Sequence, residues 1–330
     1  MEKYFGTLPS GLQATLYTIC CGRMMAAVTD FGAALVQLRV DGTDVVLGYD
    51  DACGYNDNDG FLGATVGRNA NRIRLSRFDL NGNPVILPAN EGKNNLHSGP
   101  DPYARRIWKT EQPDGSTLHF FLHSPDGDQG FPGNADIRVT YHLTENALTI
   151  SYDAVSDRDT VFNFTNHSYF NLFGEDHPEQ AMDQLLTIPG RWFNPDDAEN
   201  IPTGEQRCVE GTPFDFRREK PLGRDIEADY EPLHLQGGYD HNFEAASPVC
   251  AVVRNPENGL TMRVSTTCPG VQIYTANFLD VVGKQGRRYP RRSGVAIETQ
   301  FAPDSVNHPE WPQPFVKAGV PYHSETTFSF

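Results

Sequence analysis

A single carboxylate stands in the middle of an apolar run near the C-terminus, Ser293-Gly-Val-Ala-Ile-Glu-Thr-Gln-Phe-Ala-Pro-Asp304. With the period of two of a β-strand, the run has a β-branched face formed by Val295, Ile297 and Thr299. Glu298 then projects from the opposite face of a strand that is predicted to be mostly buried. A buried carboxylate is costly unless it is paired, hydrogen-bonded or protonated, and this makes Glu298 a candidate for chemistry. The alternative is an ordinary surface glutamate on a half-exposed strand.

A second strand with unusual side chains is predicted over Val161-Phe-Asn-Phe-Thr-Asn-His-Ser-Tyr-Phe-Asn171. One of its faces carries four hydrogen-bonding side chains in a row, those of Asn163, Thr165, His167 and Tyr169. The polar face of a structural strand normally also carries Lys or Glu, and this face has neither. His167 is therefore a possible proton-transfer partner for Glu298, although a lone histidine in a strand is more often structural.

Further candidates for ligand contact lie in predicted loops. Arg68 and Arg72 follow a strand that is predicted to be buried. Their planar guanidinium groups can hold carboxylates or sugar hydroxyls, but arginines at strand ends more often form surface ion pairs. His97 lies in a loop, and loops on a rigid β-scaffold are favoured places for ligand contacts. Asp240 follows a Gly-Gly turn, where it either faces a cleft or is an ordinary turn residue.

Several patterns for metal or cofactor binding are incomplete. His119 and His123 are four residues apart, but in a predicted strand they do not lie adjacent as helical ligands would. The segment Asp126-Gly-Asp128 lacks the later ligands of a calcium loop. The chain contains no Cys-x-x-Cys pair, no G-x-S-x-G motif and no phosphate-binding glycine-rich loop ahead of a helix. The sequence thus indicates no metal and no nucleotide cofactor.

Composition narrows the partners and the compartment. The chain has 330 residues and a formal net charge of −16, which disfavours binding to nucleic acid or to an anionic membrane surface. No run of about 18 apolar residues is present, and the N-terminus has no secretory signal pattern. We interpret the cysteines as reduced thiols, because Cys20 and Cys21 are adjacent and no spacing suggests a disulfide framework. A cytoplasmic protein is therefore expected.

Turns and short strands dominate the rest of the chain. The 30 Gly and 24 Pro residues are scattered, and Asp41-Gly42 and Asn81-Gly82 are hairpin signals. No segment sustains helical spacing over more than two turns, and no internal repeat is present. Strands are predicted at residues 117–123, 137–143, 148–155, 248–254, 260–267, 270–279, 294–301 and 324–330. The pattern predicts an antiparallel all-β protein, with residues 1–330 in one large multi-sheet sandwich.

Several segments, taken together, resemble the signature segments of the aldose 1-epimerases, also called galactose mutarotases. In chain order they are Gly67-Arg-Asn-Ala-Asn-Arg-Ile73, Asn94-Asn-Leu-His97, Asp126-Gly-Asp-Gln-Gly-Phe-Pro-Gly133, Asn163-Phe-Thr-Asn-His-Ser-Tyr-Phe-Asn-Leu172, Ile201-Pro-Thr-Gly-Glu205, Gly211-Thr-Pro-Phe-Asp-Phe216, Tyr239-Asp-His-Asn-Phe243, Tyr274-Thr-Ala-Asn-Phe-Leu279 and Ala296-Ile-Glu-Thr-Gln300. The set is far more specific than any one segment. Two departures, Asn69 and Ser98, adjoin the expected site and bear on sugar preference.

The resemblance implies a β-supersandwich of the galactose mutarotase type with few short helices. It also implies interconversion of the α and β anomers of free aldohexoses such as glucose and galactose, without a cofactor. In this family pattern, Glu298 would be the general base and His167 the general acid. Glu298 must then be ionised while His167 is protonated, and we hypothesise that their opposite charges favour this pairing. Sugar contacts are implied for Arg68, His97, Asp240 and Gln272, with Asn69 and Tyr169 nearby.

Two alternatives to a mutarotase of free sugars stay open. A hexose-6-phosphate 1-epimerase would need a cationic pocket, and arginine pairs occur at Arg217-Arg218, Arg287-Arg288 and Arg291-Arg292. A non-catalytic sugar-binding protein could share the fold, although a binding module does not need an acid and a base together. The expected partner is a small aldose, with no nucleic acid and no membrane. The expected assembly is a monomer or a weak homodimer.

Overall fold

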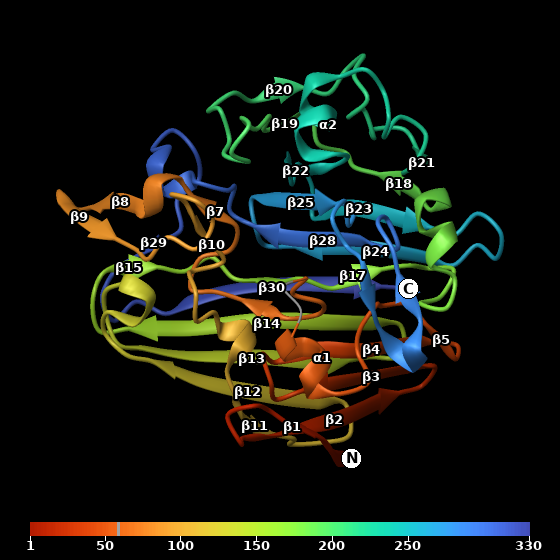
Figure 1. Cartoon of the computed structure of the whole chain (residues 1–330), viewed down its shortest axis with the longest axis horizontal. Coiled ribbons are helices and arrows are strands. Elements are labelled where there is room, and N and C mark those ends of the chain that lie inside the picture. The colour runs from red at the N-terminus through yellow and green to blue at the C-terminus, as the bar shows by residue number, and fades with distance from the viewer. Residues whose placement is uncertain (58–59) are drawn as a thin grey trace.

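Antiparallel sheets account for most of the structure, as the alternation of short strands and turns predicts. The computed structural model describes residues 1–57 and 60–330, and its strands pair in antiparallel fashion. The prediction of an antiparallel all-β protein is confirmed. In Figure 1 the N-terminal strands lie at the bottom of the molecule, and helix α2 (Glu231–Gln236) lies at the top.

Three large sheets contain most of the strands in the described residues. The five-stranded sheet follows the chain in sequence, as β1 (Glu2–Thr7), β2 (Gln13–Cys21), β3 (Met24–Thr29), β4 (Ala34–Val40) and β5 (Thr43–Asp44). The nine-stranded sheet has the order β11 (Lys109–Glu111), β12 (Thr117–Ser124), β13 (Ala135–Leu143), β14 (Ala147–Ser156), β30 (Tyr322–Ser329), β24 (Thr261–Thr266), β23 (Val249–Arg254), β18 (Leu185–Thr187) and β21 (Lys220–Pro221). The six-stranded sheet has the order β17 (Tyr169–Phe170), β28 (Val295–Gln300), β25 (Gly270–Tyr274), β22 (Asp240–Glu244), β19 (Trp192–Phe193) and β20 (Arg207–Cys208).

Small elements connect these sheets. Two-stranded pairs form between β6 (Thr65–Val66) and β16 (Thr165–Asn166), β7 (Arg72–Ile73) and β10 (Asn95–Leu96), β8 (Arg77–Leu80) and β9 (Asn83–Ile86), β15 (Thr160–Val161) and β29 (Phe315–Val316), and β26 (Val281–Val282) and β27 (Arg288–Tyr289). Helix α1 is Ala52–Asp57, and short 3₁₀ segments occur at Arg74–Ser76, Tyr103–Arg105, Asp128–Gly130, Pro178–Asp183, Lys284–Gly286 and Ser305–Asn307. The predicted hairpins at Asp41-Gly42 and Asn81-Gly82 are confirmed as β4–β5 and β8–β9.

The largest core cluster brings together apolar faces of several sheets. Val28 of β3, Val139 of β13, Ile273 of β25 and Ile297 of β28 belong to the same buried cluster. Val295 joins them, so the β-branched face predicted for the C-terminal strand is directed into the core. Because side chains alternate along a strand, the other face of β28 points away from this core.

That other face of the six-stranded sheet carries polar side chains in register. Strand pairing places Asn242 of β22 opposite Gln272 of β25, and Gln272 opposite Glu298 of β28. Asp240 and Tyr274 form the neighbouring row. Directly opposed residues in antiparallel strands are close neighbours on one face. The sheet therefore gathers polar groups from distant parts of the sequence at one place.

The strand predicted over residues 161–171 is not continuous. It is divided into β15, β16 and β17, which pair with β29, β6 and β28 respectively. The segment bends because each piece joins a different partner. His167 lies between β16 and β17, where its backbone N–H donates to the Ala64 carbonyl at 2.9 Å and its carbonyl accepts from the Gly63 N–H at 3.0 Å. These two bonds fix the position of the histidine.

The strand predicted at residues 270–279 ends early, at Tyr274. Ala276 has a φ of 52°, which interrupts a strand ladder. The residues that follow leave the sheet and form one rim of a pocket, described below. The other predicted strands agree with β12, β13, β14, β23, β24, β28 and β30 to within two residues at each end.

Candidate active site

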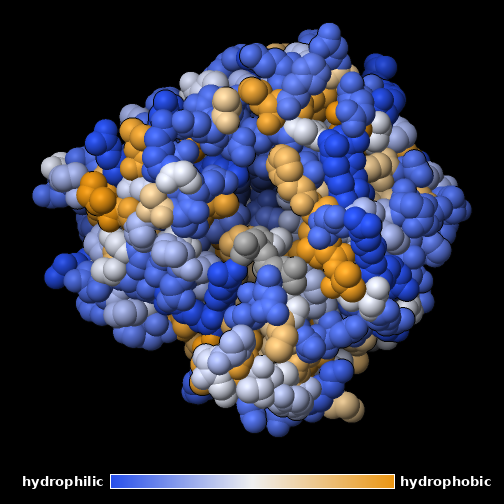
Figure 2. Space-filling model, in the orientation of Figure 1, coloured by the Kyte–Doolittle hydropathy of each residue, from blue (hydrophilic) through white to orange (hydrophobic). Residues whose placement is uncertain are grey.

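A pocket of about 420 Å³ opens over the polar face of the six-stranded sheet. Figure 2 shows a hollow near the centre of this side of the molecule, over β25, with hydrophilic side chains on one side of it and hydrophobic side chains on the other. This volume is typical of a site for a small molecule. The residues that line the pocket are Gly60, Phe61, Asn71, Arg72, Glu91, Leu96, His97, His167, Tyr169, Asn200, Asp240, Tyr274, Phe278, Leu279, Asp280, Val281 and Glu298.

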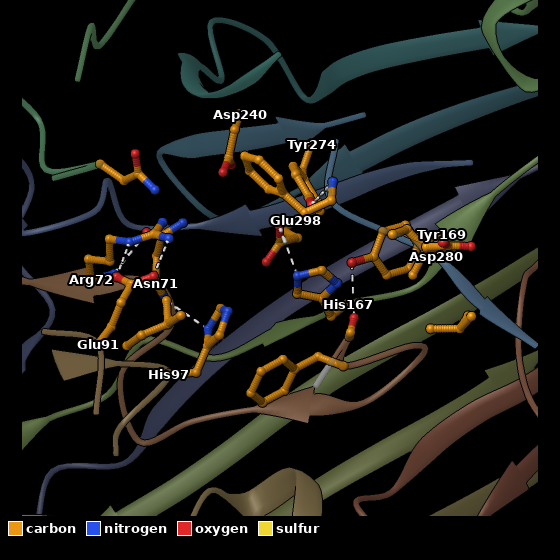
Figure 3. A pocket seen from close by; sticks show the side chains of 17 residues that line it. Asn71, Arg72, Glu91, His97, His167, Tyr169, Asp240, Tyr274, Asp280 and Glu298 are labelled. Atoms are coloured by element: carbon orange, nitrogen blue, oxygen red, sulfur yellow. Dashed lines mark hydrogen bonds and ion pairs between the residues drawn. The ribbon is translucent and has the colours of Figure 1, made fainter. Parts of the chain in front are cut away.

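Glu298 and His167 face each other inside this pocket (Figure 3). Nε2 of His167 lies 3.6 Å from Oε1 of Glu298, and the two side chains are 7% and 3% exposed. The other polar atoms, Nδ1 of His167 and Oε2 of Glu298, have no protein hydrogen-bond partner among the described residues. A carboxyl group and an imidazole at this separation can exchange protons with one small substrate placed beside them.

Burial shifts the pKa values of this pair in opposite directions. Burial raises the pKa of Glu298 well above its usual value; nearby Asp240 adds to the shift and Arg72 opposes it. Burial lowers the pKa of His167 to about 4. Both shifts favour a neutral pair, with one proton on the carboxyl group. An ion pair with that proton on the imidazole has the same total charge, so the hypothesis of an ionised Glu298 beside a protonated His167 stays a prediction.

His97 is held as a neutral donor at the side of the pocket. Its Nδ1 accepts a hydrogen bond from the backbone N–H of Asn71 at 3.2 Å. Burial lowers the pKa of His97 well below its usual value, and His167 and Arg72 lower it further. Because Nδ1 is an acceptor, the ring proton belongs on Nε2, which is then free to donate to a ligand.

Asp240 is oriented by Gln272, its neighbour across the strand pair. Nε2 of Gln272 donates to Oδ1 of Asp240 at 2.7 Å. Burial raises the pKa of Asp240, and Arg72 and the Gln272 hydrogen bond oppose this rise. Gln272 itself is 1% exposed and is not one of the lining residues. The structure therefore places Asp240 in the pocket and Gln272 behind it.

Tyr169 forms a wall of the pocket next to the histidine. Its hydroxyl donates to the Gly60 carbonyl at 2.9 Å, and its ring centroid lies 5.0 Å from that of His167. Tyr274 packs edge-on against Tyr169 at 6.0 Å. These contacts make Tyr169 a support for the His167 ring, and its hydroxyl proton is already donated to Gly60.

Arg68 and Asn69 do not line the pocket. The Arg68 guanidinium is buried and donates to the Ser124 hydroxyl at 2.5 Å and to the Pro132 carbonyl at 2.8 Å. The Asn69 amide donates to the carbonyl of Ala70 at 2.9 Å. The expectation that these two side chains contact a sugar finds no support in this placement.

The contacts of Arg68 predict a structural role. Replacing Arg68 by Met is expected to lower the free energy of unfolding by about 2–3 kcal/mol, because buried carbonyl and hydroxyl groups lose their donor. Urea denaturation measures this loss. The affinity of the folded variant for a sugar should stay within a few-fold of wild type, and a selective loss of sugar binding would contradict the structural role.

Arg72 is the arginine that the structure places in the pocket. Nε and Nη2 of Arg72 donate to the two carboxylate oxygens of Glu91, at 2.6 and 2.8 Å. Arg68 and Arg72 were both candidates by residue type, but the resemblance implied a sugar contact for Arg68 only. Asn71 lies in one of the segments that resemble the epimerase family, and Glu91 carried no signal of its own. Tyr274 could have been found, because it begins one of the segments that resemble the epimerase family.

A buried acid–base pair in a polar pocket, on a sandwich of antiparallel sheets, defines a candidate proton-transfer enzyme for a small polar molecule. The model of the aldose 1-epimerase family matches residues 15–329, so the chain belongs to this family. It is 39% identical to the galactose mutarotase of Mus musculus over 99% of this chain and 97% of that protein. It is 38% identical to the aldose 1-epimerase of Escherichia coli (strain K12), over 93% and 92% of the two chains.

Solved structures agree with this family assignment. The chain superposes with a TM-score of 0.88 on the GalM/aldose epimerase homologue from C. elegans, with 29% identity over 95% of this chain and 98% of that one. Galactose 1-epimerase from Lactobacillus acidophilus NCFM also gives a TM-score of 0.88, with 25% identity over 100% and 98%. The predicted β-supersandwich of the galactose mutarotase type is thereby confirmed. Within the described residues, the helices are all too short or too polar to cross a membrane.

Proposed function

We propose that this protein is an aldose 1-epimerase that interconverts the α and β anomers of free aldohexoses such as glucose and galactose. The observation that carries the proposal is the 3.6 Å separation of His167 and Glu298 inside the pocket of a chain that belongs to this family. Changing the anomer requires a proton to leave the C1 hydroxyl and another to reach the ring oxygen. Two neighbouring groups, one basic and one acidic, meet this requirement.

The proposed reaction begins with Glu298 ionised and His167 protonated. Glu298 accepts the proton of the C1 hydroxyl, His167 donates a proton to the ring oxygen, and the bond between C1 and that oxygen breaks. The open-chain aldehyde rotates about C1–C2, and the same two transfers in reverse close the ring on the other face. Ring opening leaves Glu298 protonated and His167 neutral, which is the pair that burial favours. The enzyme therefore stabilises the state that holds the open-chain intermediate.

Three further side chains are placed to hold sugar hydroxyls. His97 offers its Nε2–H, Asp240 offers a carboxylate, and Arg72 offers the guanidinium nitrogen that Glu91 does not use. Asp240 is held by the six-stranded sheet. Arg72 belongs to β7 and His97 follows β10, and these two strands pair with each other. Fixed donors and acceptors keep the sugar aligned with the acid–base pair, which contributes to rate through orientation.

The charges in the pocket disfavour a hexose 6-phosphate. Arg72 is the only arginine or lysine among the described residues that line the pocket, and Glu91 already matches its charge, so a phosphate would find no unmatched cation there and would face Asp240. Arginines of the paired segments donate to carboxylates: Arg217 to Asp215, Arg287 to Glu175 and Arg288 to Asp280. We therefore favour uncharged aldoses over their phosphates.

The function is tested by following the optical rotation of freshly dissolved α-D-glucose and α-D-galactose with and without the protein. A faster approach to the same final rotation is expected for at least one of the two sugars. If the protein accelerates the change in optical rotation of neither sugar, nor of any other aldose tested, a non-catalytic sugar-binding protein becomes the better description. Sugar binding measured by calorimetry in the same buffer then separates that outcome from an inactive preparation.

We further infer a single domain over residues 1–330, acting in the cytoplasm as a monomer or weak homodimer. Support for one domain comes from the largest core cluster, which contains residues from Ile19 to Phe328. Support for a reducing compartment comes from the six cysteines, all of which are free thiols. Light scattering coupled to size-exclusion chromatography tests the assembly.

A further inference from the structure

One cation lies among the carboxyl groups of the pocket. Within the described residues that line it, Arg72 is the only arginine or lysine. Its side chain is 11% exposed, so its charge acts in a largely desolvated place. An arginine there, left to itself, would attract anionic ligands through its planar fork of donors. The kind of ligand that Arg72 binds therefore depends on whether a carboxylate of the protein already neutralises its charge.

Glu91 matches that charge in a two-point geometry. Both of its carboxylate oxygens accept from Arg72, one from Nε at 2.6 Å and one from Nη2 at 2.8 Å (Figure 3). This pairing uses one edge of the guanidinium and leaves Nη1 for the pocket. The hydrogen bonds of Glu91, and the nearby Asp240, outweigh the effect of burial and raise the pKa of Arg72.

The backbone holds Glu91 in this position. Its N–H donates to the Asn94 carbonyl at 3.1 Å, and the Asn94 N–H donates back to the Glu91 carbonyl at 2.9 Å. The Asn94 side chain accepts from the N–H of Leu75 at 2.9 Å, which ties this turn to the chain that follows Arg72. Glu91 and Arg72 are thus positioned by two connected loops, and their pairing does not depend on a ligand.

Asp240 is then the charge that an anionic ligand would meet in the pocket. The Glu298–His167 pair has no net charge in either of its two forms, and Arg72 is matched by Glu91, so the ligand would face Asp240 without an available counter-charge. An uncharged aldose can still receive a hydrogen bond from Nη1 of Arg72. The same arginine therefore donates a hydrogen bond to a hydroxyl group of the ligand when Glu91 is present. It would bind a carboxylate of the ligand when Glu91 is absent.

We propose that Glu91 determines the charge selectivity of this pocket: by pairing with Arg72 it restricts the site to uncharged aldoses and rejects uronic acids. The inference rests on the proposed function. Glu91 acts through Arg72 and is a positioning and specificity residue. It is not assigned any proton transfer.

The test compares Glu91→Gln with wild type on D-galactose and on D-galacturonate, by exchange NMR between the anomers at neutral pH. In the variant, kcat/KM for galacturonate relative to galactose is expected to rise about tenfold or more. KM for galactose is expected to rise several-fold with a smaller change in kcat, because Arg72 loses its orientation. Glu91→Asp keeps the charge, so it should keep the wild-type preference.

Glu199→Gln is the matched control, because it makes the same charge change on a neighbouring surface pair. Glu199 lies 2.8 Å from Lys93, and both side chains are about half exposed. This variant should leave the preference unchanged. The double variant Arg72→Gln/Glu91→Gln should lose the gain toward galacturonate, because the released guanidinium is gone.

An unchanged preference in a folded Glu91→Gln variant that still converts galactose would overturn this proposal and leave the proposed function intact. The same gain in Glu199→Gln would also overturn it, since net charge alone would then be the cause. If Glu91→Gln does not fold, Glu91→Ala makes the same test. A wild-type protein that converts no aldose contradicts the proposed function instead.

Discussion

Replacing Glu298 by Gln is expected to lower kcat for galactose about 10²–10⁴-fold, with KM changed only a few-fold. The amide has nearly the shape of the carboxyl group but cannot accept the proton of the C1 hydroxyl. Position supports this expectation, because Glu298 is 3% exposed and lies 3.6 Å from His167. Polarimetry at several sugar concentrations separates the two constants. A Glu298→Gln variant within tenfold of wild type would contradict its role as a base.

The same substitution is expected to stabilise the protein at neutral and alkaline pH. Burial raises the pKa of Glu298 above its unfolded value, so its contribution to stability is complete below about pH 4.3 and is lost as pH rises through the folded pKa. Glutamine does not ionise, so the Glu298→Gln variant does not undergo this loss. The free energy of unfolding of the variant should exceed that of wild type by about 0.5–2 kcal/mol at pH 8 and match it near pH 4.

Urea denaturation at both pH values measures this difference. Glu145→Gln is a suitable control, because Glu145 is exposed in the turn between β13 and β14. That variant should show no gain at pH 8. A loss of activity in Glu298→Gln together with the gain in stability indicates a group held in an unfavourable place for its function, whereas loss of both indicates damaged packing.

Local periodicity made Glu298 and His167 candidates, and the resemblance to the epimerase family supplied their expected roles as base and acid. Glu298 was identifiable because a lone carboxylate interrupts a run whose other face is β-branched, and β28 has that face in the core. His167 was identifiable from a stripe of hydrogen-bonding side chains. The register that brings Asn242, Gln272 and Glu298 into one row joins segments far apart in sequence, so no local pattern could predict it.

The two arginines show where local reasoning is insufficient. Arg68 and Arg72 lie in one short loop and have the same chemistry. Their hydrogen-bond partners decide which one reaches a ligand. Arg68 donates to Ser124 and Pro132 away from the pocket, whereas Arg72 donates to Glu91 inside the pocket. These contacts depend on how β12 and the loop before β10 fold back on the chain. The residue types do not rank them, and the resemblance implied the sugar contact for Arg68 instead of Arg72.

The bending of residues 161–171 has a similar origin. The sequence alternates well enough for one long strand, but β15, β16 and β17 each have a different partner strand. Competition between sheets therefore overrides the local preference for extension. The bend places His167 outside the ladders, with its ring between Tyr169 and the pocket.

Replacing His167 by Asn is expected to lower kcat about 10²–10⁴-fold, because ring opening then lacks a donor for the ring oxygen. A pH–rate profile of wild type should show limbs that belong to the Glu298–His167 pair as a unit. Each single substitution, Glu298→Gln or His167→Asn, should change these limbs. Limbs that survive both substitutions would contradict the pairing.

The stability of the same variant tests the environment of His167 without reference to activity. Burial lowers the pKa of His167 to about 4, below its unfolded value of about 6.5. Its neutral form therefore favours the folded state above about pH 6.5, and this contribution is lost as pH falls toward 4, because only the unfolded chain takes up the proton. The full loss is about 3 kcal/mol.

Asn cannot bind that proton, so the free energy of unfolding of His167→Asn should fall less steeply than that of wild type between pH 7 and 4. Parallel slopes would show that burial does not hold His167 neutral, and the ion pair would then be present before the sugar binds.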